Sequence, residues 1–150
     1  MGVWAPNCAE WTLAQFATAR VGMIQVNINP AYRLSEVEYT LNKVGVKALV
    51  CAEKFKTSDY VGMINELAPE IASSKPGDLR SKRLPDLRIV AQIGGQPGRG
   101  WMAFDEISEQ ATGKHAMQVE EIAQTLDRND PINIQFTSGT TGLPKGVVQK

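Results

Sequence analysis

Apolar residues recur at helical spacing in three stretches of the chain, and the first stretch lies between Asn7 and Gly22. Asn7 can cap this helix with Glu10 at the third helical position, and Gly22 stands where the helix should end. We therefore predict a helix that packs one apolar face on the core. The side chains expected on that face are Ala9, Leu13, Phe16 and Ala17.

The second helical stretch begins near residue 34. Ser35 and Glu38 have the spacing of a capping box, and Gly45 stands at the position of a C-terminal stop. Leu34 and Tyr39 occupy the positions of a hydrophobic staple. The buried stripe of this helix is expected at Val37, Leu41 and Val44.

The third helical stretch contains a proline. Because the ring of Pro69 would clash with the preceding turn, we expect the helix to kink or split there. Its apolar face is expected to hold Tyr60, Met63, Ile64, Leu67 and Ile71.

Short apolar runs separate the three helices and indicate strands at residues 23–26, 48–51 and 88–93, while Val3 and Trp4 indicate the end of another strand. Strands that alternate with helices favour an α/β fold in which helices flank a parallel sheet.

The segments between these elements are predicted to be less regular. Residues 75–88 are basic and polar and indicate an exposed connection, and the glycine-rich residues 94–100 indicate a surface loop. We interpret the basic residues of this connection as solvated rather than as a phosphate-binding patch. They are Lys75, Arg80, Lys82, Arg83 and Arg88. Short helices are expected around residues 105–111 and 120–126.

The composition is that of an ordinary globular domain. The 150 residues are 43% hydrophobic, which suffices for one core. Sixteen basic and sixteen acidic residues cancel, so no overall field favours nucleic acid. No apolar run approaches the ~20 residues of a transmembrane helix, so none is expected.

The two cysteines, Cys8 and Cys51, lie far apart among apolar residues, which favours buried free thiols in a reducing compartment. The single histidine, His115, has no partner at metal-ligand spacing. The sequence therefore predicts no metal site built from these side chains.

The segment that carries recognisable chemistry is Thr137 to Gly146, TSGTTGLPKG, which follows the alternating apolar residues Ile132, Ile134 and Phe136. Its glycines let backbone N–H groups converge on an anion, its hydroxyls can add hydrogen bonds, and its lysine can add a point charge. We predict that it binds polyphosphate. The hydroxyl donors would be Thr137, Ser138, Thr140 and Thr141, the shaping glycines Gly139, Gly142 and Gly146, and the charged residue Lys145.

This segment is not a Walker A loop. That motif requires Gly-Lys followed by Ser or Thr and opens a helix. Here Pro144, Lys145 and Gly146 stand instead, and Val147 and Val148 indicate a second strand. The expected arrangement is a strand–loop–strand hairpin.

The loop closely resembles the signature loop of the adenylate-forming, or AMP-binding, superfamily. The likeness extends over almost the whole chain, through WAPNCAEW, VNINPAYR and LSEVEYTLNKVGVKALV. Within the superfamily, NPAYR, LAPEI, RLPDLR and DPINIQFTSGTTG are most similar to the fatty-acid and medium-chain branch of acyl-CoA synthetases.

The resemblance implies that residues 1–150 are an incomplete part of the large N-terminal domain of such an enzyme, cut at both ends and lacking the C-terminal domain. The later adenine, Mg²⁺ and ribose motifs of the family do not occur in the sequence. The remainder of a parent chain would be needed for a complete site, and the segment alone is expected to be inactive.

The reaction implied by the resemblance has two halves. A carboxylate attacks the α-phosphorus of Mg-ATP to give acyl-AMP and pyrophosphate, and the thiol of coenzyme A then displaces AMP. The small-molecule partners would be ATP, a fatty acid and coenzyme A, with Mg²⁺ bound largely outside this segment. Lys145 would act on the phosphate oxygens as the catalytic residue.

Two other interpretations remain open. The chain could come from an adenylation domain with another acid or acceptor, such as an aryl-acid ligase or a carrier-protein-loading domain, or it could be a non-catalytic remnant. The expected compartment is the cytoplasm, with the mitochondrial matrix as the alternative.

Overall fold

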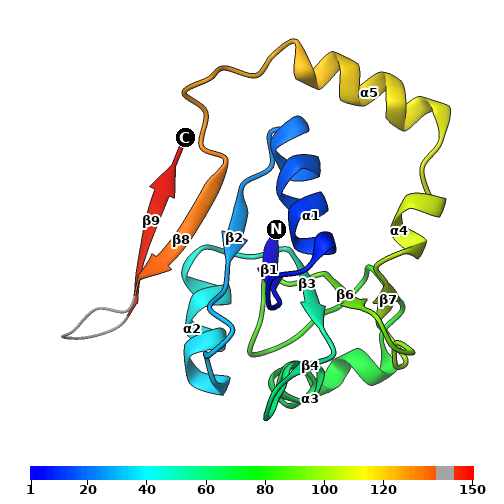
Figure 1. Ribbon diagram of the computed structural model, residues 1–150. Coiled ribbons are helices and arrows are strands. Elements are labelled where there is room, and N and C mark those ends of the chain that lie inside the picture. Colours follow the sequence, from blue (N-terminus) through cyan, green and yellow to red (C-terminus); the bar gives the residue numbers. More distant parts are fainter. Residues whose placement is uncertain (138–143) are drawn as a thin grey trace.

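A computed structural model describes residues 1–137 and 144–150 of the chain. Seven strands form one sheet in the order β7-β6-β3-β1-β2-β8-β9 (Figure 1). Every neighbouring pair is parallel except β8 and β9. The strands are β1 (Gly2–Trp4), β2 (Gln25–Asn27), β3 (Ala48–Ala52), β6 (Ile89–Ile93), β7 (Met102–Ala103), β8 (Asn133–Thr137) and β9 (Lys145–Gln149). The predicted α/β class is confirmed.

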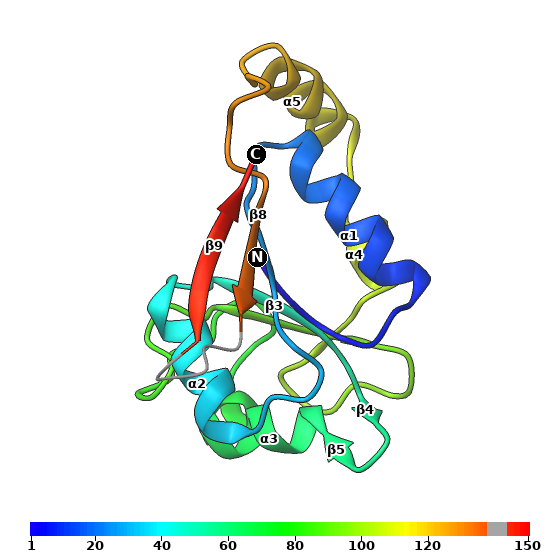
Figure 2. The same cartoon turned by 60° about the vertical axis from the view of Figure 1, so that its left-hand side comes forward.

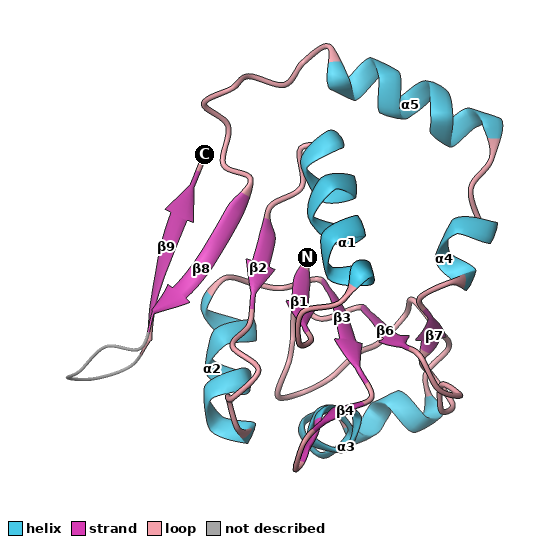
Figure 3. Cartoon of the chain, in the orientation of Figure 1, coloured by secondary structure: helices cyan, strands magenta, loops and turns pink. Residues whose placement is uncertain are grey.

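Helices and one small hairpin make up the rest of the regular structure (Figure 3). The helices are α1 (Ala9–Arg20), α2 (Leu34–Lys43), α3 (Tyr60–Leu67), the 3-10 helix η1 (Pro69–Ser73), α4 (Glu106–Glu109) and α5 (Gly113–Ala123), and the hairpin pairs β4 (Lys54–Phe55) with β5 (Ser58–Asp59).

The two faces of the sheet are covered unequally. The larger hydrophobic cluster joins the strands to α2, α3 and η1 on one face, around buried residues such as Val37, Leu49 and Ile64. The smaller cluster contains Val3, Ala5 and Ala14 and lies on the other face, beneath α1. Figure 2 shows α1 and α2 on opposite sides of the strands.

Strand β1 lies at the centre of the sheet, as a parallel neighbour of both β2 and β3. Val3 and Trp4 are 1% and 0% exposed, and the N-terminal ammonium donates to the carbonyl of Ile24 at 2.8 Å. All three residues of β1 are therefore buried at the centre of the sheet.

Helix α1 corrects the first sequence prediction. Leu13 and Phe16, expected in the core, are 61% and 73% exposed, whereas Ala14 and Thr18 face the sheet. Ala9 and Ala17 are also exposed, and the N-cap is Cys8 rather than Asn7. The apolar stripe turns outward because the strands beneath α1 present polar amide side chains.

Helix α2 begins two residues earlier than its predicted cap. Its N-cap is Arg33, whose backbone N–H donates to the carboxylate of Glu36 at 2.8 Å. Val37 and Leu41 are buried as predicted, and Val44 is half-buried.

The predicted ends and break of the helices are confirmed. Gly22 and Gly45 follow α1 and α2 with φ of +66° and +61°, a left-handed conformation that favours glycine. Pro69 ends the third helical stretch after Leu67 and begins η1. On its predicted apolar face, Tyr60, Ile64, Leu67 and Ile71 are buried and Met63 is half-buried.

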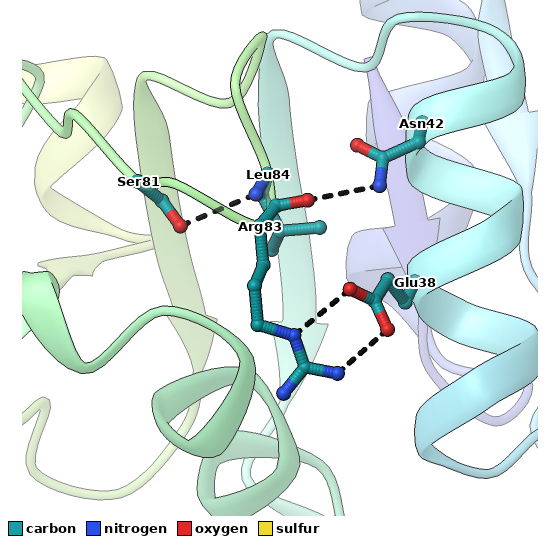
Figure 4. A network of polar contacts seen from close by, with 5 residues as sticks. All are labelled: Glu38, Asn42, Ser81, Arg83 and Leu84. Carbon is teal, nitrogen blue, oxygen red and sulfur yellow. Dashed lines mark hydrogen bonds and ion pairs between the residues drawn. The ribbon is translucent and has the colours of Figure 1, made fainter.

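The connection at residues 75–88, expected to be exposed, is instead fixed by three buried leucines, Leu79, Leu84 and Leu87. Figure 4 shows its contact with α2: the Arg83 guanidinium donates to both oxygens of Glu38, at 2.9 and 2.6 Å, and the Arg83 carbonyl accepts from Asn42. Glu38 therefore holds this connection rather than capping α2.

Residues 94–100 form the expected loop, and the region that follows is arranged differently from the prediction. Helix α4 is shorter than expected, and α5 begins at Gly113 rather than near residue 120. The Thr112 backbone N–H donates to Nδ1 of His115 at 3.1 Å, which fixes this earlier start. Both helices lie outside the core, with Ile107 and Met117 exposed (Figure 1).

Arg83→Gln should reduce stability by a small, pH-dependent amount. Hydrogen bonds from Arg83 lower the pKa of Glu38 below the usual glutamate value. A lowered folded-state pKa gives stability that is present above the unfolded pKa and lost as the pH falls through the folded one. Urea unfolding should thus separate variant and wild type at neutral pH and bring them together below about pH 4, the ordinary glutamate range.

Arg80→Gln is the matched control. Arg80 pairs with Asp78, and both side chains are largely exposed, at 72% and 68%. We expect no separation at any pH, since such pairs contribute little. A pH-independent loss for Arg83→Gln would contradict the assignment to this ion pair.

Candidate functional site

The carboxyl ends of β2, β3 and β8 meet at one edge of the sheet because these strands are parallel (Figure 1). Three connections leave the sheet there: the turn at residues 28–33, the β4–β5 hairpin and the segment after Thr137. Open α/β sheets bind ligands at this edge.

Strands β8 and β9 form the hairpin that the sequence predicts. Thr137 pairs with Lys145 at its neck, and the Thr137 hydroxyl donates to the Lys145 carbonyl at 3.4 Å. Both residues are exposed. The other predicted phosphate-binding residues, Ser138, Gly139, Thr140, Thr141 and Gly142, lie outside the described residues.

Gly146 lies against the larger hydrophobic cluster. A Cβ atom there would come within 3.1 Å of Cγ2 of Ile134 and 3.4 Å of the Phe136 ring. Glycine thus avoids a tight contact between β9 and the side chains of Ile134 and Phe136.

A network of amide side chains lies between α1 and the strands β2 and β8. Gln15 of α1 accepts from Gln25 at 3.0 Å and from Asn133 at 3.1 Å. Asn27 accepts from Gln25 and donates to Asn133 and Gln135, at 2.8, 3.1 and 3.2 Å. We name these five residues the amide network.

The amide network reaches the neck of the hairpin. Alternate residues of a strand share a face, so Asn133 and Gln135 lie on the same side of β8 as Thr137. Gln25, Asn27 and Asn133 are no more than 8% exposed. Sequence analysis missed this feature, although Gln25-x-Asn27 and Asn133-x-Gln135 repeat with the period of a strand.

A cavity of about 350 Å³ lies between the turn after β2 and the β4–β5 hairpin. Two cations, Arg33 and Lys56, line it, and the ammonium of Lys56 lies 5.3 Å from the centre of the Phe55 ring. None of the described residues that line the cavity is acidic. They are Asn29, Pro30, Ala31, Arg33, Phe55, Lys56, Thr57 and Ser58. We name this space the cationic cavity.

Sequence analysis did not select these cations, because Arg33 and Lys56 are 23 positions apart and only the fold brings them together. Two basic residues of the connection before β6 form ion pairs elsewhere. Arg83 pairs with Glu38, and Arg80 pairs with Asp78. Their interpretation as surface residues rather than a phosphate patch agrees with these contacts.

Beneath the cationic cavity, the rings of Trp4 and Tyr60 stack with their centres 4.1 Å apart. Each ring donates to the turn above: Trp4 Nε1 to the Asn29 carbonyl at 3.1 Å, and the Tyr60 hydroxyl to the Pro30 carbonyl at 2.9 Å. Burial raises the pKa of Tyr60, so its hydroxyl keeps the donated proton.

A second, mostly apolar cavity of about 540 Å³ lies at the opposite edge of the sheet, against Met1, Met23, Val46 and Ile134. It is remote from the hairpin neck and the cations. Within the described residues, no three His, Cys, Asp or Glu side chains gather as metal ligands. Nor does any described helix have the length and apolar character to cross a membrane.

Comparison with known proteins decides the family. The model of the "AMP-binding enzyme" family matches residues 1–150. The chain belongs to this family. The AMP-binding chain is 48% identical over 147 residues to the mitochondrial medium-chain acyl-CoA ligase ACSF2 of Macaca fascicularis, covering 97% of itself and 24% of that protein. It is 36% identical to the putative acyl-CoA synthetase YngI of Bacillus subtilis, covering 99% of itself and 27% of that protein.

Solved structures agree with this assignment. The apo structure of MbtA from Mycobacterium smegmatis superposes with a TM-score of 0.71 at 27% identity, over 98% of this AMP-binding chain and 23% of MbtA. The chain thus spans about a quarter of the length of the relatives it matches. The mostly parallel sheet corresponds to part of a larger adenylate-forming fold.

In this AMP-binding chain, Asn27→Ala should destabilise the fold by about 1–3 kcal/mol, because deletion of the buried Asn27 amide leaves the buried side-chain oxygen of Asn133 without its donor. Asn42→Ala, which removes an exposed amide that donates to the Arg83 carbonyl, should cost less than ~1 kcal/mol. Urea unfolding measures both. Equal losses would show that the amide network contributes no more than a surface hydrogen bond.

Proposed function

We propose that this chain supplies the polyphosphate-binding hairpin of an ATP-dependent acyl-CoA synthetase that activates a medium-chain fatty acid. One observation carries the proposal: the hairpin places Thr137 and Lys145 together at the carboxyl edge of the sheet. The names of the ACSF2 relatives support the medium-chain substrate.

In the first half-reaction, the carboxylate oxygen bonds to the α-phosphorus of ATP and the bond to the pyrophosphate oxygen breaks. Negative charge accumulates on the leaving pyrophosphate, and in this proposal the Lys145 ammonium and the Thr137 hydroxyl would bind it. Catalysis of such a displacement consists of positioning and charge neutralisation. Ser138, Thr140 and Thr141 would add hydroxyl donors from the part of the loop outside the described residues.

Mg²⁺ would neutralise phosphate charge, but no metal-ligand cluster exists among residues 1–137 and 144–150. Because the relatives are about four times as long, we propose that these residues work within a longer polypeptide and form no acyl-AMP by themselves.

In the second half-reaction, the coenzyme A thiolate attacks the acyl carbonyl and AMP leaves. We propose that the cationic cavity binds the phosphate groups of coenzyme A. Arg33 follows β2 and Lys56 follows β3. Both cations therefore belong to connections at the same edge of the sheet as the neck of the β8–β9 hairpin. Arg33 and Lys56 would bind the phosphates, while Phe55 and Pro30 offer apolar surface to the nucleoside.

The relatives also bear on the compartment. The ACSF2 relatives are named mitochondrial, so we propose the mitochondrial matrix in preference to the cytoplasm.

Lys145→Ala in the full-length gene product should lower fatty-acid-dependent exchange of pyrophosphate into ATP by about 100-fold or more, the typical effect of removing one well-placed electrostatic donor. Lys150→Ala removes a lysine just beyond the same strand and should leave the exchange unchanged. Unchanged pyrophosphate exchange in Lys145→Ala would contradict the proposed role of this lysine.

The double substitution Arg33→Gln and Lys56→Gln should raise the KM for coenzyme A about tenfold, equivalent to ~1.4 kcal/mol, with the exchange reaction unaffected. Lys54→Gln is the matched control, since Lys54 lies on the same hairpin without lining the cationic cavity. Steady-state kinetics with varied coenzyme A measure the effect. Equal KM values in both variants and wild type would place coenzyme A elsewhere.

A further inference from the structure

We infer that Tyr60 is a positioning residue that joins the two walls of the cationic cavity and sets the placement of its two cations. The inference rests on the proposed function, in which this cavity binds coenzyme A phosphates. One wall is the turn at residues 29–33, which carries Arg33, and the other is the β4–β5 hairpin, which carries Lys56.

Tyr60 contacts the turn through its side chain. Its hydroxyl donates to the Pro30 carbonyl at 2.9 Å. The neighbouring Asn29 carbonyl accepts from Trp4 Nε1 at 3.1 Å, and the Asn29 side chain accepts from the Ala31 N–H at 2.9 Å. The consecutive carbonyls of Asn29 and Pro30, which precede Arg33 in the turn, thus each accept a hydrogen bond from a buried aromatic side chain.

Tyr60 contacts the hairpin through its backbone. The N–H groups of Tyr60 and Val61 both donate to the Glu53 carbonyl, at 3.1 and 3.2 Å. Glu53 precedes β4 and Tyr60 follows β5, so these bonds close the base of the hairpin that carries Lys56. Tyr60 therefore contacts both walls: its hydroxyl donates to the turn, and its backbone N–H donates at the base of the hairpin.

The position of Tyr60 itself is strongly constrained. It is 0% exposed, stacks on the equally buried Trp4 and is the first residue of α3. A rigid phenol ring between two loops keeps their separation constant. Two cations held at a constant separation lose less freedom when they bind a pair of phosphates, so the affinity for coenzyme A depends on this link.

The test is Tyr60→Phe in the full-length gene product, which removes one oxygen and keeps the stacked ring. We expect the KM for coenzyme A to rise about three- to tenfold, the effect of one lost hydrogen bond. The kcat and the KM for ATP should stay unchanged. General destabilisation would instead lower kcat by reducing the amount of active enzyme, so the split between KM and kcat separates positioning from folding.

Tyr32→Phe is the matched control. Tyr32 lies in the same turn and is also buried, but its hydroxyl has no hydrogen-bond partner among the described residues. Its removal should leave the KM for coenzyme A unchanged. An equal rise in both variants would overturn the inference, because the effect would then follow from any change in the turn.

Two further readouts separate this inference from the proposed function. Amide hydrogen exchange at residues 31–33 should become faster in Tyr60→Phe and stay unchanged in Tyr32→Phe, whether or not coenzyme A binds here. Suppose that the Arg33→Gln and Lys56→Gln variant raises the KM for coenzyme A while Tyr60→Phe changes neither this KM nor amide exchange. The positioning role of Tyr60 is then wrong, and coenzyme A binding in the cationic cavity is retained. If amide exchange changes but no variant of the cavity alters the KM for coenzyme A, the cavity does not bind coenzyme A. Tyr60 then has no role in coenzyme A binding.

Discussion

The structure depends on the pairing of one three-residue strand, β1, with two parallel neighbours. Gly2, Val3 and Trp4 hydrogen-bond between β2 and β3, and both side-chain faces of the strand are buried. This pairing aligns the carboxyl ends of β2 and β3, and β8 extends the alignment through β2. The turn, the small hairpin and the neck of the phosphate-binding hairpin meet at one edge because parallel pairing leaves no other arrangement.

The two faces of this sheet follow different physical rules. On the α2 and α3 face, apolar side chains pack around Trp4 and Tyr60 and support the turn that leads to Arg33. On the α1 face, part of the contact is the amide network, whose hydrogen bonds are directional and fix β8 against β2 and α1. Strand β8 is therefore fixed by polar contacts on this face and by the burial of Phe136 on the other.

Helix α1 shows why local periodicity can mislead. Its apolar stripe, with Leu13 and Phe16, faces outward, while Gln15 faces the sheet. Periodicity identifies this helix and its end at Gly22, but it cannot tell which face meets this sheet, because that depends on Gln25, Asn27 and Asn133 far along the chain.

The sequence alone determined the α/β class, the break at Pro69, the glycine ends of α1 and α2, the hairpin around Lys145 and the family. These features depend on neighbouring residues or on a contiguous motif, so a linear pattern contains them. The tertiary structure decided the outward stripe of α1, the burial of Leu79, Leu84 and Leu87, the amide network and the cationic cavity. Each joins residues from separate elements, and Arg33 and Lys56 become neighbours only because parallel strands deliver their connections to one edge.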